Sequence, residues 1–322
     1  MITRDDLDQA RAVIRGHVHR TPLLSVASLG ARCGVELHVK CENLQKTGSY
    51  KPRGGLNLVE RLGDAEKRRG VVVMSAGNLA QGVAYAARRA GVRCWVVMLG
   101  TASAAKIRAT EGYGAEVILH PDPATWFERV EEVRTRHEAL LVDPWGDPAL
   151  IAGYGSIGAE ILEDLPDVEV VVVPVGGGTL ISGIAVAIKL HRPTVQVVGV
   201  ECASGRLVHD SVAAGKPIRL ARAPSIADGL GSPTTSDLVV ELVRRYVDDL
   251  VAVSEAEIHE AMRGLLERGK LLVEGAGAVG VAALLAGRME GRRGRKVAAV
   301  LSGGNVDFER LRALLGPGDP PP

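Results

Sequence analysis

The sequence predicts an α/β fold with two lobes, each a mostly parallel sheet flanked by helices, with the small lobe inserted into the large one. Three observations support this prediction. Short valine-rich segments alternate along the chain with segments whose apolar spacing is helical. Such alternation is typical of parallel sheets covered by helices on both faces. Glycine-rich turns follow several valine-rich segments, and 322 residues suffice for two lobes of medium size.

The elements up to residue 141 form one alternating series. A first helix is expected over residues 4–16, because Thr3 can cap its start. A strand is expected over residues 35–41, and a helix that begins at Pro52 is expected to continue through residues 56–69. The next strands are expected over residues 71–74, 94–98 and 116–119, and the next helices over residues 80–90, 104–110 and 123–137. We assign residues 63–152 to the small, mobile lobe.

A second alternating series starts at residues 157–162. Its strands are expected over residues 168–175, 196–201, 249–253 and 297–301, and its helices over residues 181–190, 237–246, 255–267 and 276–287. We therefore assign residues 1–62 and 153–322 to the large lobe. The last residues, 316–322, are rich in proline and are expected to be disordered.

Composition excludes several classes of protein. The net charge of +1 gives no electrostatic reason to bind nucleic acid. Residues 170–188 are almost long enough to cross a membrane, but Pro174 and three glycines within them favour a strand, a loop and a helix. Charged residues from Arg4 onward give no signal-peptide pattern. The four cysteines show no Cys-x-x-Cys pair, so we expect reduced thiols in a cytoplasmic protein.

Lys51 is the first candidate for chemistry. It lies in the segment ENLQKTGSYKPRG, where Pro52 suits the first position of a helix because its missing N–H has no helical partner there. The positive field at a helix N-terminus favours the neutral, nucleophilic amine of a lysine. A neutral lysine amine can form a Schiff base. The spacing alone leaves an ordinary surface lysine as the alternative.

Three glycine-containing turns follow predicted strands. Gly176-Gly177-Gly178-Thr179 precedes a helix, so its N–H groups could converge on a phosphate, although a simple tight turn is the alternative. It matches neither the dinucleotide fingerprint nor the P-loop. The other two turns are Ser75-Ala76-Gly77-Asn78 and Ser302-Gly303-Gly304-Asn305. Ligands bind at this edge of open α/β sheets, so we expect a site in a cleft between the lobes.

Together and in this order, these segments resemble the fold type II pyridoxal-phosphate enzymes of the tryptophan synthase beta-like superfamily. The threonine dehydratase and serine racemase group is the most similar branch. The resemblance extends to Arg20-Thr21-Pro22-Leu23, Gly153-Tyr154-Gly155-Ser156-Ile157, Gly199-Val200-Glu201, Ser225-Ile226-Ala227-Asp228-Gly229 and Glu274-Gly275-Ala276-Gly277. It implies pyridoxal 5'-phosphate as cofactor, a small amino acid as substrate and a homo-oligomer, either a dimer or a tetramer. The large lobe would bind the cofactor.

The resemblance also implies residue roles. Lys51 would be the catalytic lysine that carries the cofactor and takes the Cα proton of the substrate. The cofactor-binding residues would be Tyr50, Lys51, Asn78, Gly176, Gly177, Gly178, Thr179, Gly229 and Ser302. The substrate-binding residues would be Ser75, Ala76, Gly77, Asn78, Leu79 and Tyr154. The neutral hydroxyl of Ser302 would face the pyridine nitrogen, which favours loss of a β-substituent over transamination. Asp228 is interpreted as a buried structural carboxylate.

The chain departs from the family pattern at several positions. Leu79 replaces a histidine and Tyr154 replaces a glutamine, so we expect a less polar substrate pocket. Serine racemases commonly have a serine where this chain has Ala76, whose methyl group cannot carry a proton. Glu201 matches a metal-binding carboxylate, but Leu207 stands near an expected second ligand position and cannot ligate. No metal site is therefore predicted.

The implied reaction is that of an L-threonine or L-serine ammonia-lyase, which gives a 2-oxo acid and ammonia. One alternative is a racemase, or a lyase for a bulkier β-hydroxy amino acid. An alternative of a different class is a carrier or regulatory protein that binds pyridoxal phosphate without catalysis.

Overall fold

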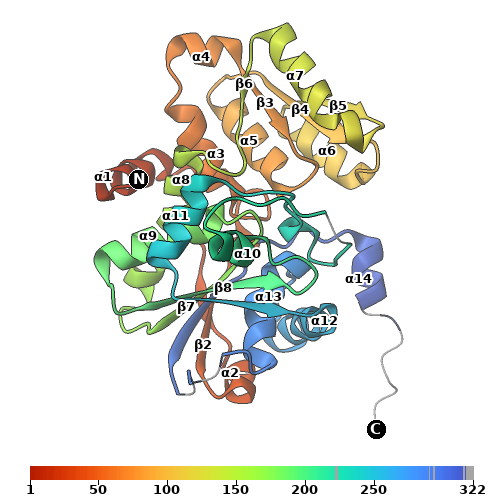
Figure 1. Ribbon diagram of the computed structural model, residues 1–322. Coiled ribbons are helices and arrows are strands. Elements are labelled where there is room, and N and C mark those ends of the chain that lie inside the picture. Colours follow the sequence, from red (N-terminus) through yellow and green to blue (C-terminus); the bar gives the residue numbers. More distant parts are fainter. Residues whose placement is uncertain (222–223, 290, 293, 315, 317–322) are drawn as a thin grey trace.

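The computed structural model describes residues 1–221, 224–289, 291–292, 294–314 and 316. These residues form two sheets, which lie in the two halves of Figure 1. The larger sheet has the strand order β1-β2-β10-β7-β8-β9, and the smaller has the order β5-β4-β3-β6. Among the described strands, only the pairing of β1 with β2 is antiparallel. The α/β fold with mostly parallel sheets is therefore confirmed.

The strands are β1 (Leu23–Ser25), β2 (Glu36–Lys40), β3 (Val71–Met74), β4 (Cys94–Leu99), β5 (Glu116–His120), β6 (Leu140–Leu141), β7 (Val170–Pro174), β8 (Gln196–Cys202), β9 (Asp249–Val253) and β10 (Lys296–Val300). The helices are α1 (Arg4–Ile14), α2 (Ala27–Cys33), α3 (Lys51–Glu60), α4 (Asp64–Arg69), α5 (Asn78–Arg89), α6 (Ala104–Gly112), α7 (Trp126–His137), α8 (Pro148–Asp164), α9 (Thr179–His191), α10 (Leu207–Ala214), α11 (Asp237–Tyr246), α12 (Glu255–Gly264), α13 (Gly275–Leu285) and α14 (Phe308–Leu314).

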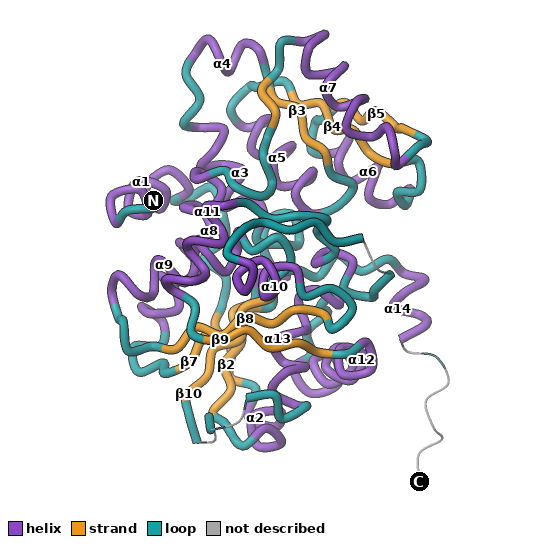
Figure 2. Tube along the Cα trace, in the orientation of Figure 1, coloured by secondary structure: helices purple, strands orange, loops and turns teal. Residues whose placement is uncertain are grey.

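The smaller sheet interrupts the larger one in chain order. All strands of the smaller sheet lie between β2 and β7 in the sequence, and Figure 2 shows the two groups of strands well separated. The small lobe is thus inserted into the large lobe, as predicted. The boundaries at residues 62/63 and 152/153 stay predictions, as does the mobility of the small lobe. Helix α8 runs through residue 152 without a break.

Most elements begin where the sequence places them, for identifiable local reasons. Thr3 caps α1 in a capping box, because its hydroxyl accepts from the N–H of Asp6 and its own N–H donates to the Asp6 carboxylate. The continuous helix expected through residues 56–69 is wrong. Helix α3 ends at Glu60, and α4 starts again after Gly63, whose N–H donates to Glu66. The helix expected over residues 255–267 also changes, since a π-helical turn, Leu265–Gly269, follows α12.

Short elements were missed because they carry little periodic signal. These are β1, β6, α2, α10 and α14. The expected disorder of residues 316–322 falls almost entirely outside the described residues, because only Gly316 among them is described.

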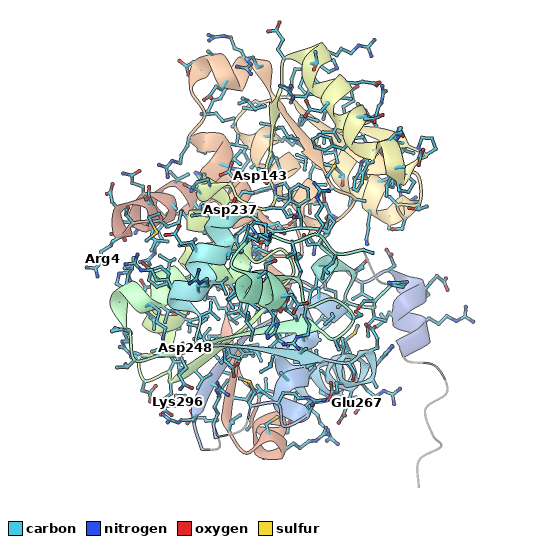
Figure 3. All side chains as sticks on the ribbon, in the orientation of Figure 1. Arg4, Asp143, Asp237, Asp248, Glu267 and Lys296 are labelled. Atoms are coloured by element: carbon cyan, nitrogen blue, oxygen red, sulfur yellow. The ribbon has the colours of Figure 1, made fainter. Side chains whose placement is uncertain are left out.

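The core is built mainly from valine, leucine, alanine and isoleucine, as the scarcity of aromatic residues requires. Strand β7 shows how the larger sheet is covered. Val171 and Val173 face one buried cluster, and Val170 and Val172 face another on the opposite side. Charged side chains such as Arg4 and Glu267 lie on the outside (Figure 3). None of the described helices has the length and apolar character needed to cross a bilayer.

The cysteines are unpaired, as predicted. Cys41, Cys94 and Cys202 are buried and Cys33 is half-buried. Burial raises the pKa of Cys33 to about 11 and that of Cys41 to about 12. These thiols are therefore protonated at neutral pH and poor nucleophiles.

A buried network of charged side chains links the start of α3 to neighbouring elements. The Arg53 guanidinium donates to both oxygens of Glu42 (2.9 and 2.9 Å) and to both oxygens of Glu160 (2.7 and 2.9 Å). Lys40 Nζ lies 2.6 Å from Glu160 Oε2. Arg53, Glu42 and Lys40 are fully buried. Burial alone would raise the pKa of Glu160, but the charge and hydrogen bonds of Arg53 and Lys40 outweigh it and lower that pKa.

Replacing Arg53 by methionine should strongly destabilise the chain, because Glu42 would lose its guanidinium partner while remaining buried. We expect a loss of about 3–5 kcal/mol in the free energy of unfolding, measured by urea denaturation. The matched control is Arg20→Met, since Arg20 also pairs with two carboxylates but its side chain is 51% exposed. That change should cost about 1 kcal/mol or less. Equal losses for the two variants would contradict this account of the network.

Candidate active site

The loop before Lys51 is bonded to the loop after β10. Tyr50 N donates to Ser302 O (3.1 Å), and Gly304 N donates to Gly48 O (2.8 Å). Ser49 and Gly303 form an antiparallel bridge between these two loops. Two loops that are far apart in the sequence therefore lie side by side. This pairing places Lys51, the first residue of α3, beside Ser302.

Close packing fixes the backbone around Lys51. A Cβ atom on Gly82 of α5 would lie 2.6 Å from Lys51 Cβ and 2.7 Å from its carbonyl carbon. On the other side, a Cβ atom on Gly153 of α8 would lie 2.4 Å from Arg53 O. Helices of both lobes therefore approach α3 more closely than any side chain would allow. Lys51 stands at the junction of the lobes.

Two tyrosines surround the Lys51 amine. Lys51 Nζ lies over the Tyr50 ring, 4.7 Å from its centroid, and over the Tyr154 ring at 5.5 Å. The two rings meet edge to face, with centroids 4.7 Å apart. Tyr154 is completely buried on α8, and its hydroxyl has no partner among the described residues. Burial raises the pKa of the Tyr154 phenol well above its usual value.

The predicted phosphate loop presents several backbone N–H groups at the start of α9. Among the described residues, the N–H groups of Gly176, Gly177 and Gly178 donate to no protein acceptor. Thr179 begins the helix, where N–H groups also have no helical partner. Gly178 has φ +92°, and a Cβ atom there would lie 2.4 Å from Val239 Cγ1. Only glycine fits this turn, which suits an anion such as a phosphate.

The glycine loop formed by Gly176, Gly177 and Gly178 is linked to the Lys51 region through a series of contacts. A Cβ atom on Gly176 would lie 2.9 Å from Leu230 Cα, and one on the neighbouring Gly229 would lie 3.0 Å from Ala276 Cβ. Ser302 Oγ in turn donates to Ala276 O (3.5 Å). The structure thus places Gly229 between the glycine loop and Ser302, at the carboxyl ends of β7 and β10.

Asn78 joins the two lobes through its side chain. Its Nδ2 donates to Glu274 Oε1 (2.7 Å), and its Oδ1 accepts from Asn305 Nδ2 (2.8 Å). Asn305 Nδ2 also donates to Thr47 O (2.8 Å) in the loop before Lys51. Burial raises the pKa of Glu274 to about 7, and the carboxylate of Asp228 acts in the same direction. The hydrogen bond from Asn78 and the charges of Lys106 and Lys51 oppose that rise.

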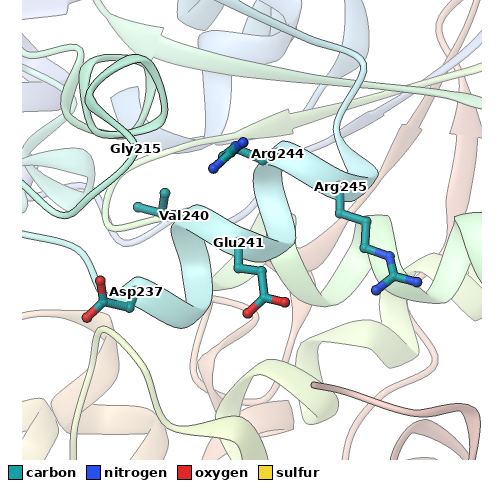
Figure 4. A pocket seen from close by; sticks show the side chains of 6 residues that line it. All are labelled: Gly215, Asp237, Val240, Glu241, Arg244 and Arg245. Atoms are coloured by element: carbon teal, nitrogen blue, oxygen red, sulfur yellow. The ribbon is translucent and has the colours of Figure 1, made fainter.

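A cavity of about 450 Å³ is lined mainly by residues of the large lobe, among them Glu274 and Asn305, and by Lys106 of the small lobe. None of the predicted cofactor or substrate residues lines it, so the predicted site in a cleft between the lobes stays a prediction. Polar side chains at the start of α6, in the small lobe, contact the large lobe beside this cavity. Lys106 Nζ lies 3.1 Å from Asp228 Oδ2, and Ser103 Oγ donates to Asp307 Oδ1 (3.1 Å). Asp228, expected to be a buried structural carboxylate, is only half-buried and lines this cavity. A second cavity, of about 410 Å³, lies along α11 and contains no predicted site residue; Figure 4 shows its charged lining, which includes Glu241 and Arg244.

The remaining predicted substrate residues divide into two groups. Ser75, Ala76 and Gly77 form the half-buried turn between β3 and α5, where Ser75 Oγ accepts from Gly77 N (3.2 Å). Leu79 is 5% exposed and, like Tyr154, belongs to the buried core. Neither Leu79 nor Tyr154 lines the cavity of about 450 Å³. A direct effect of these two on pocket polarity therefore stays a prediction.

Glu201 uses both carboxylate oxygens to cap α10. They accept from Val208 N (2.8 Å) and His209 N (3.1 Å). Burial raises the pKa of Glu201 to about 7, against these hydrogen bonds. The described residues contain no cluster of three histidine, cysteine, aspartate or glutamate side chains suited to a metal ion. The arrangement around Glu201 is that of a helix cap.

Comparison with known protein families shows to which family this chain belongs. The family model described as "Pyridoxal-phosphate dependent enzyme" matches residues 14–303. The chain belongs to this family. An L-threonine ammonia-lyase of Thermotoga maritima is 46% identical over 321 residues, covering 99% of this chain and 79% of the relative. The catabolic L-threonine dehydratase of Escherichia coli is 41% identical over 314 residues, covering 97% of this chain and 95% of the relative.

Solved structures support the same family. Maize serine racemase superposes with a TM-score of 0.91 at 35% identity, covering 97% of this chain and 96% of the other. The processed form of a threonine deaminase of Solanum lycopersicum superposes with a TM-score of 0.89 at 30% identity, covering 97% of this chain and 93% of the other. The family's cofactor is pyridoxal phosphate, and the chain is a pyridoxal-phosphate-dependent enzyme of fold type II.

The residues present fit this cofactor. The unpartnered N–H groups of Gly176, Gly177 and Gly178 suit its phosphate, and the Lys51 amine suits its aldehyde. Ser302 offers a neutral hydroxyl at the same edge of the sheet.

Two residues of this site were missed as functional candidates. Glu274 was noticed only as part of the motif Glu274-Gly275-Ala276-Gly277, and Asn305 only as the end of a glycine turn. A signal existed for Asn305, because a polar side chain directly after a strand and two glycines lies at the ligand-binding edge. The partnership of Glu274 with Asn78 spans 196 residues and has no local signal.

Replacing Gly82 by alanine should displace Lys51, because the new methyl group would overlap Lys51 Cβ. We expect a destabilisation of about 1–3 kcal/mol and weaker binding of pyridoxal phosphate, measured by thermal unfolding and by the visible absorbance of the lysine-bound cofactor. Gly112→Ala is the control, since a Cβ atom there meets nothing within 4 Å. Unchanged cofactor absorbance in Gly82→Ala would show that the close contact does not position Lys51.

Proposed function

We propose that the protein is an ammonia-lyase that acts on L-threonine, with L-serine as a related substrate, and releases a 2-oxo acid and ammonia. The relatives named above, at 41–46% identity over nearly the whole chain, support this reaction. The observation that carries the proposal is the position of Lys51. Lys51 is the first residue of α3, directly after Tyr50, whose N–H donates to Ser302 O, and its amine lies over the Tyr50 and Tyr154 rings.

When bound, pyridoxal phosphate supplies an electron-withdrawing ring that weakens the Cα–H bond of an amino acid. Lys51 Nζ is the proposed base that takes the Cα proton. The turn formed by Ser75, Ala76 and Gly77 is proposed to bind the substrate carboxylate, since it precedes the N-terminus of α5 and its positive field. Loss of the β-hydroxyl and hydrolysis then complete the reaction.

Ser302 is proposed to govern the outcome. A serine hydroxyl stays neutral, whereas a carboxylate in its place would stabilise a positive charge on the nearby ring nitrogen. The Ser302 side chain is buried, and its hydroxyl makes a long contact of 3.5 Å with Ala276 O, so its proton could turn to a ring nitrogen instead. Such a neutral partner favours prompt loss of the β-hydroxyl over transamination.

Asn78 and Tyr50 complete the proposed cofactor site. Asn78 is proposed to bond the ring hydroxyl of the cofactor, and Glu274 and Asn305 hold its amide in place. Tyr50 is proposed to pack on the cofactor ring. Gly176, Gly177, Gly178, Thr179 and Gly229 are proposed to enclose the phosphate end of the site. A preference for bulkier β-hydroxy amino acids, through Leu79 and Tyr154, also remains a proposal.

Assembly and location are proposals as well. The chain is proposed to form a homodimer or homotetramer. The four unpaired cysteines support action in the cytoplasm, where thiols stay reduced.

Lys51→Ala should abolish the release of 2-oxo acid from L-threonine, together with the visible absorbance of the lysine-bound cofactor. The matched control is Lys46→Ala, which removes a lysine in the same segment while leaving Lys51 in place. Normal cofactor absorbance in Lys51→Ala would refute the assignment of Lys51. Normal absorbance in the wild-type protein, without turnover of any β-hydroxy amino acid, would favour the non-catalytic carrier.

Racemisation of L-serine should be slow relative to elimination. Serine and aspartate racemases are among the similar structures, at 35% and 32% identity, so this activity is the second candidate. A racemase needs a second group that exchanges a proton on the opposite face of the substrate, and the methyl group of Ala76 cannot do so. Chiral chromatography after incubation with L-serine measures both products. Formation of D-serine as fast as pyruvate would refute this prediction.

A further inference from the structure

Lys51 has an unusual aromatic environment for a lysine that must change charge. Its Nζ lies over both tyrosine rings, at 4.7 Å from the Tyr50 centroid and 5.5 Å from the Tyr154 centroid. Both distances are within the range over which an aromatic ring face attracts a cation. The Tyr154 side chain is fully buried, so water does not screen this attraction at its ring.

The ring of Tyr154, rather than its hydroxyl, makes this contact. The hydroxyl has no hydrogen-bond partner among the described residues. The edge-to-face contact with Tyr50, at 4.7 Å and 72°, holds the ring in place, and the backbone of Gly54 leaves room for it. A Cβ atom on Gly54 would lie 2.5 Å from Tyr154 Cε1.

We infer that Tyr50 and Tyr154 form an aromatic cradle that stabilises the Lys51 ammonium produced when Lys51 takes the Cα proton of the substrate. This inference rests on the proposed role of Lys51 as the base. Before the step, Nζ is a neutral amine. After the step it has gained a proton and a positive charge, and the Cα–H bond has broken. The cradle stabilises the charged product of the transfer and therefore favours the transfer.

Other groups also act on the charge of Lys51. The N-terminus of α3 carries a positive field, and the buried carboxyl group of Glu274 interacts with the Lys51 charge. Asp228 and Lys106 are further charged groups beside Glu274. The attraction between the two rings and the Lys51 ammonium depends on the electron density of the rings. Changing that density leaves the charges of Glu274, Asp228 and Lys106 unchanged.

The cradle has two opposite consequences. During turnover it favours proton uptake by Lys51. In the chain without cofactor it favours the ammonium form, which cannot attack an aldehyde, so it slows the capture of pyridoxal phosphate. Weakening the ring attraction without changing the ring shape should therefore slow turnover and accelerate capture. A packing defect would slow both.

The test replaces Tyr154 by phenylalanine and then by phenylalanine analogues of increasing ring fluorination, because fluorine withdraws electron density from the ring face and leaves the ring size nearly unchanged. For the full-length protein, kcat for L-threonine and the rate at which the cofactor-free chain captures pyridoxal phosphate are measured across the series. Thermal unfolding verifies that each variant is folded. Tyr154→Phe keeps the ring and is the reference against which the fluorinated variants are compared. Tyr154→Leu, which removes the ring, should lower kcat by roughly two- to thirtyfold.

We expect kcat to fall and the capture rate to rise steadily with fluorination. A flat series, or two rates that change in the same direction, would overturn the cradle. Failure of the wild-type chain to capture the cofactor at all would overturn the proposed function and the cradle with it. Normal capture and turnover by the wild-type protein with a flat series would overturn the cradle alone. If Tyr154→Leu does not fold, the fluorinated series still decides the question.

Discussion

The ion pairs of Arg53 are the interaction on which the active site depends most. Arg53 lies two residues after Lys51, and its guanidinium bridges Glu42, which precedes α3, and Glu160, which lies on α8. Burying these charges is costly, so they are tolerated only when all of them are paired. The network therefore fixes the start of α3 against α8 and the segment that contains Glu42. Gly82 and Gly153 then allow α5 and α8 to contact this helix directly.

The active site also depends on contacts between the two lobes. Asn78 comes from the small lobe, and its partners Glu274 and Asn305 come from the large lobe. Lys106 and Asp228 form another pair across the same boundary. The proposed site therefore combines residues of both lobes. Contact between two lobes around a site can exclude water from the reacting atoms.

Much of this could be predicted from sequence because the signals are local. Valine runs such as that of β7 predict buried strands, and the glycines after them predict turns at the ligand-binding edge. Lys51 beside Pro52 predicts a helix start. The pairing of Arg53 with Glu160, 107 residues away, has no such signal, nor has that of Asn78 with Glu274. The helix break at Gly63 was missed because the flanking residues are good helix formers. The departure at Tyr154 was visible as a substitution, but only the structure shows its ring beside the Lys51 amine.

The central claim is that Lys51, and no other lysine, holds the cofactor. Reducing the holoenzyme with borohydride converts a Schiff base into a stable amine, and peptide mass spectrometry then locates the modified residue. Lys106 is the informative rival, because it lines the cavity of about 450 Å³. The structure predicts that the cofactor mass is found on the peptide containing Lys51 and is absent from the peptide containing Lys106. Modification of Lys106 with unmodified Lys51 would contradict the account.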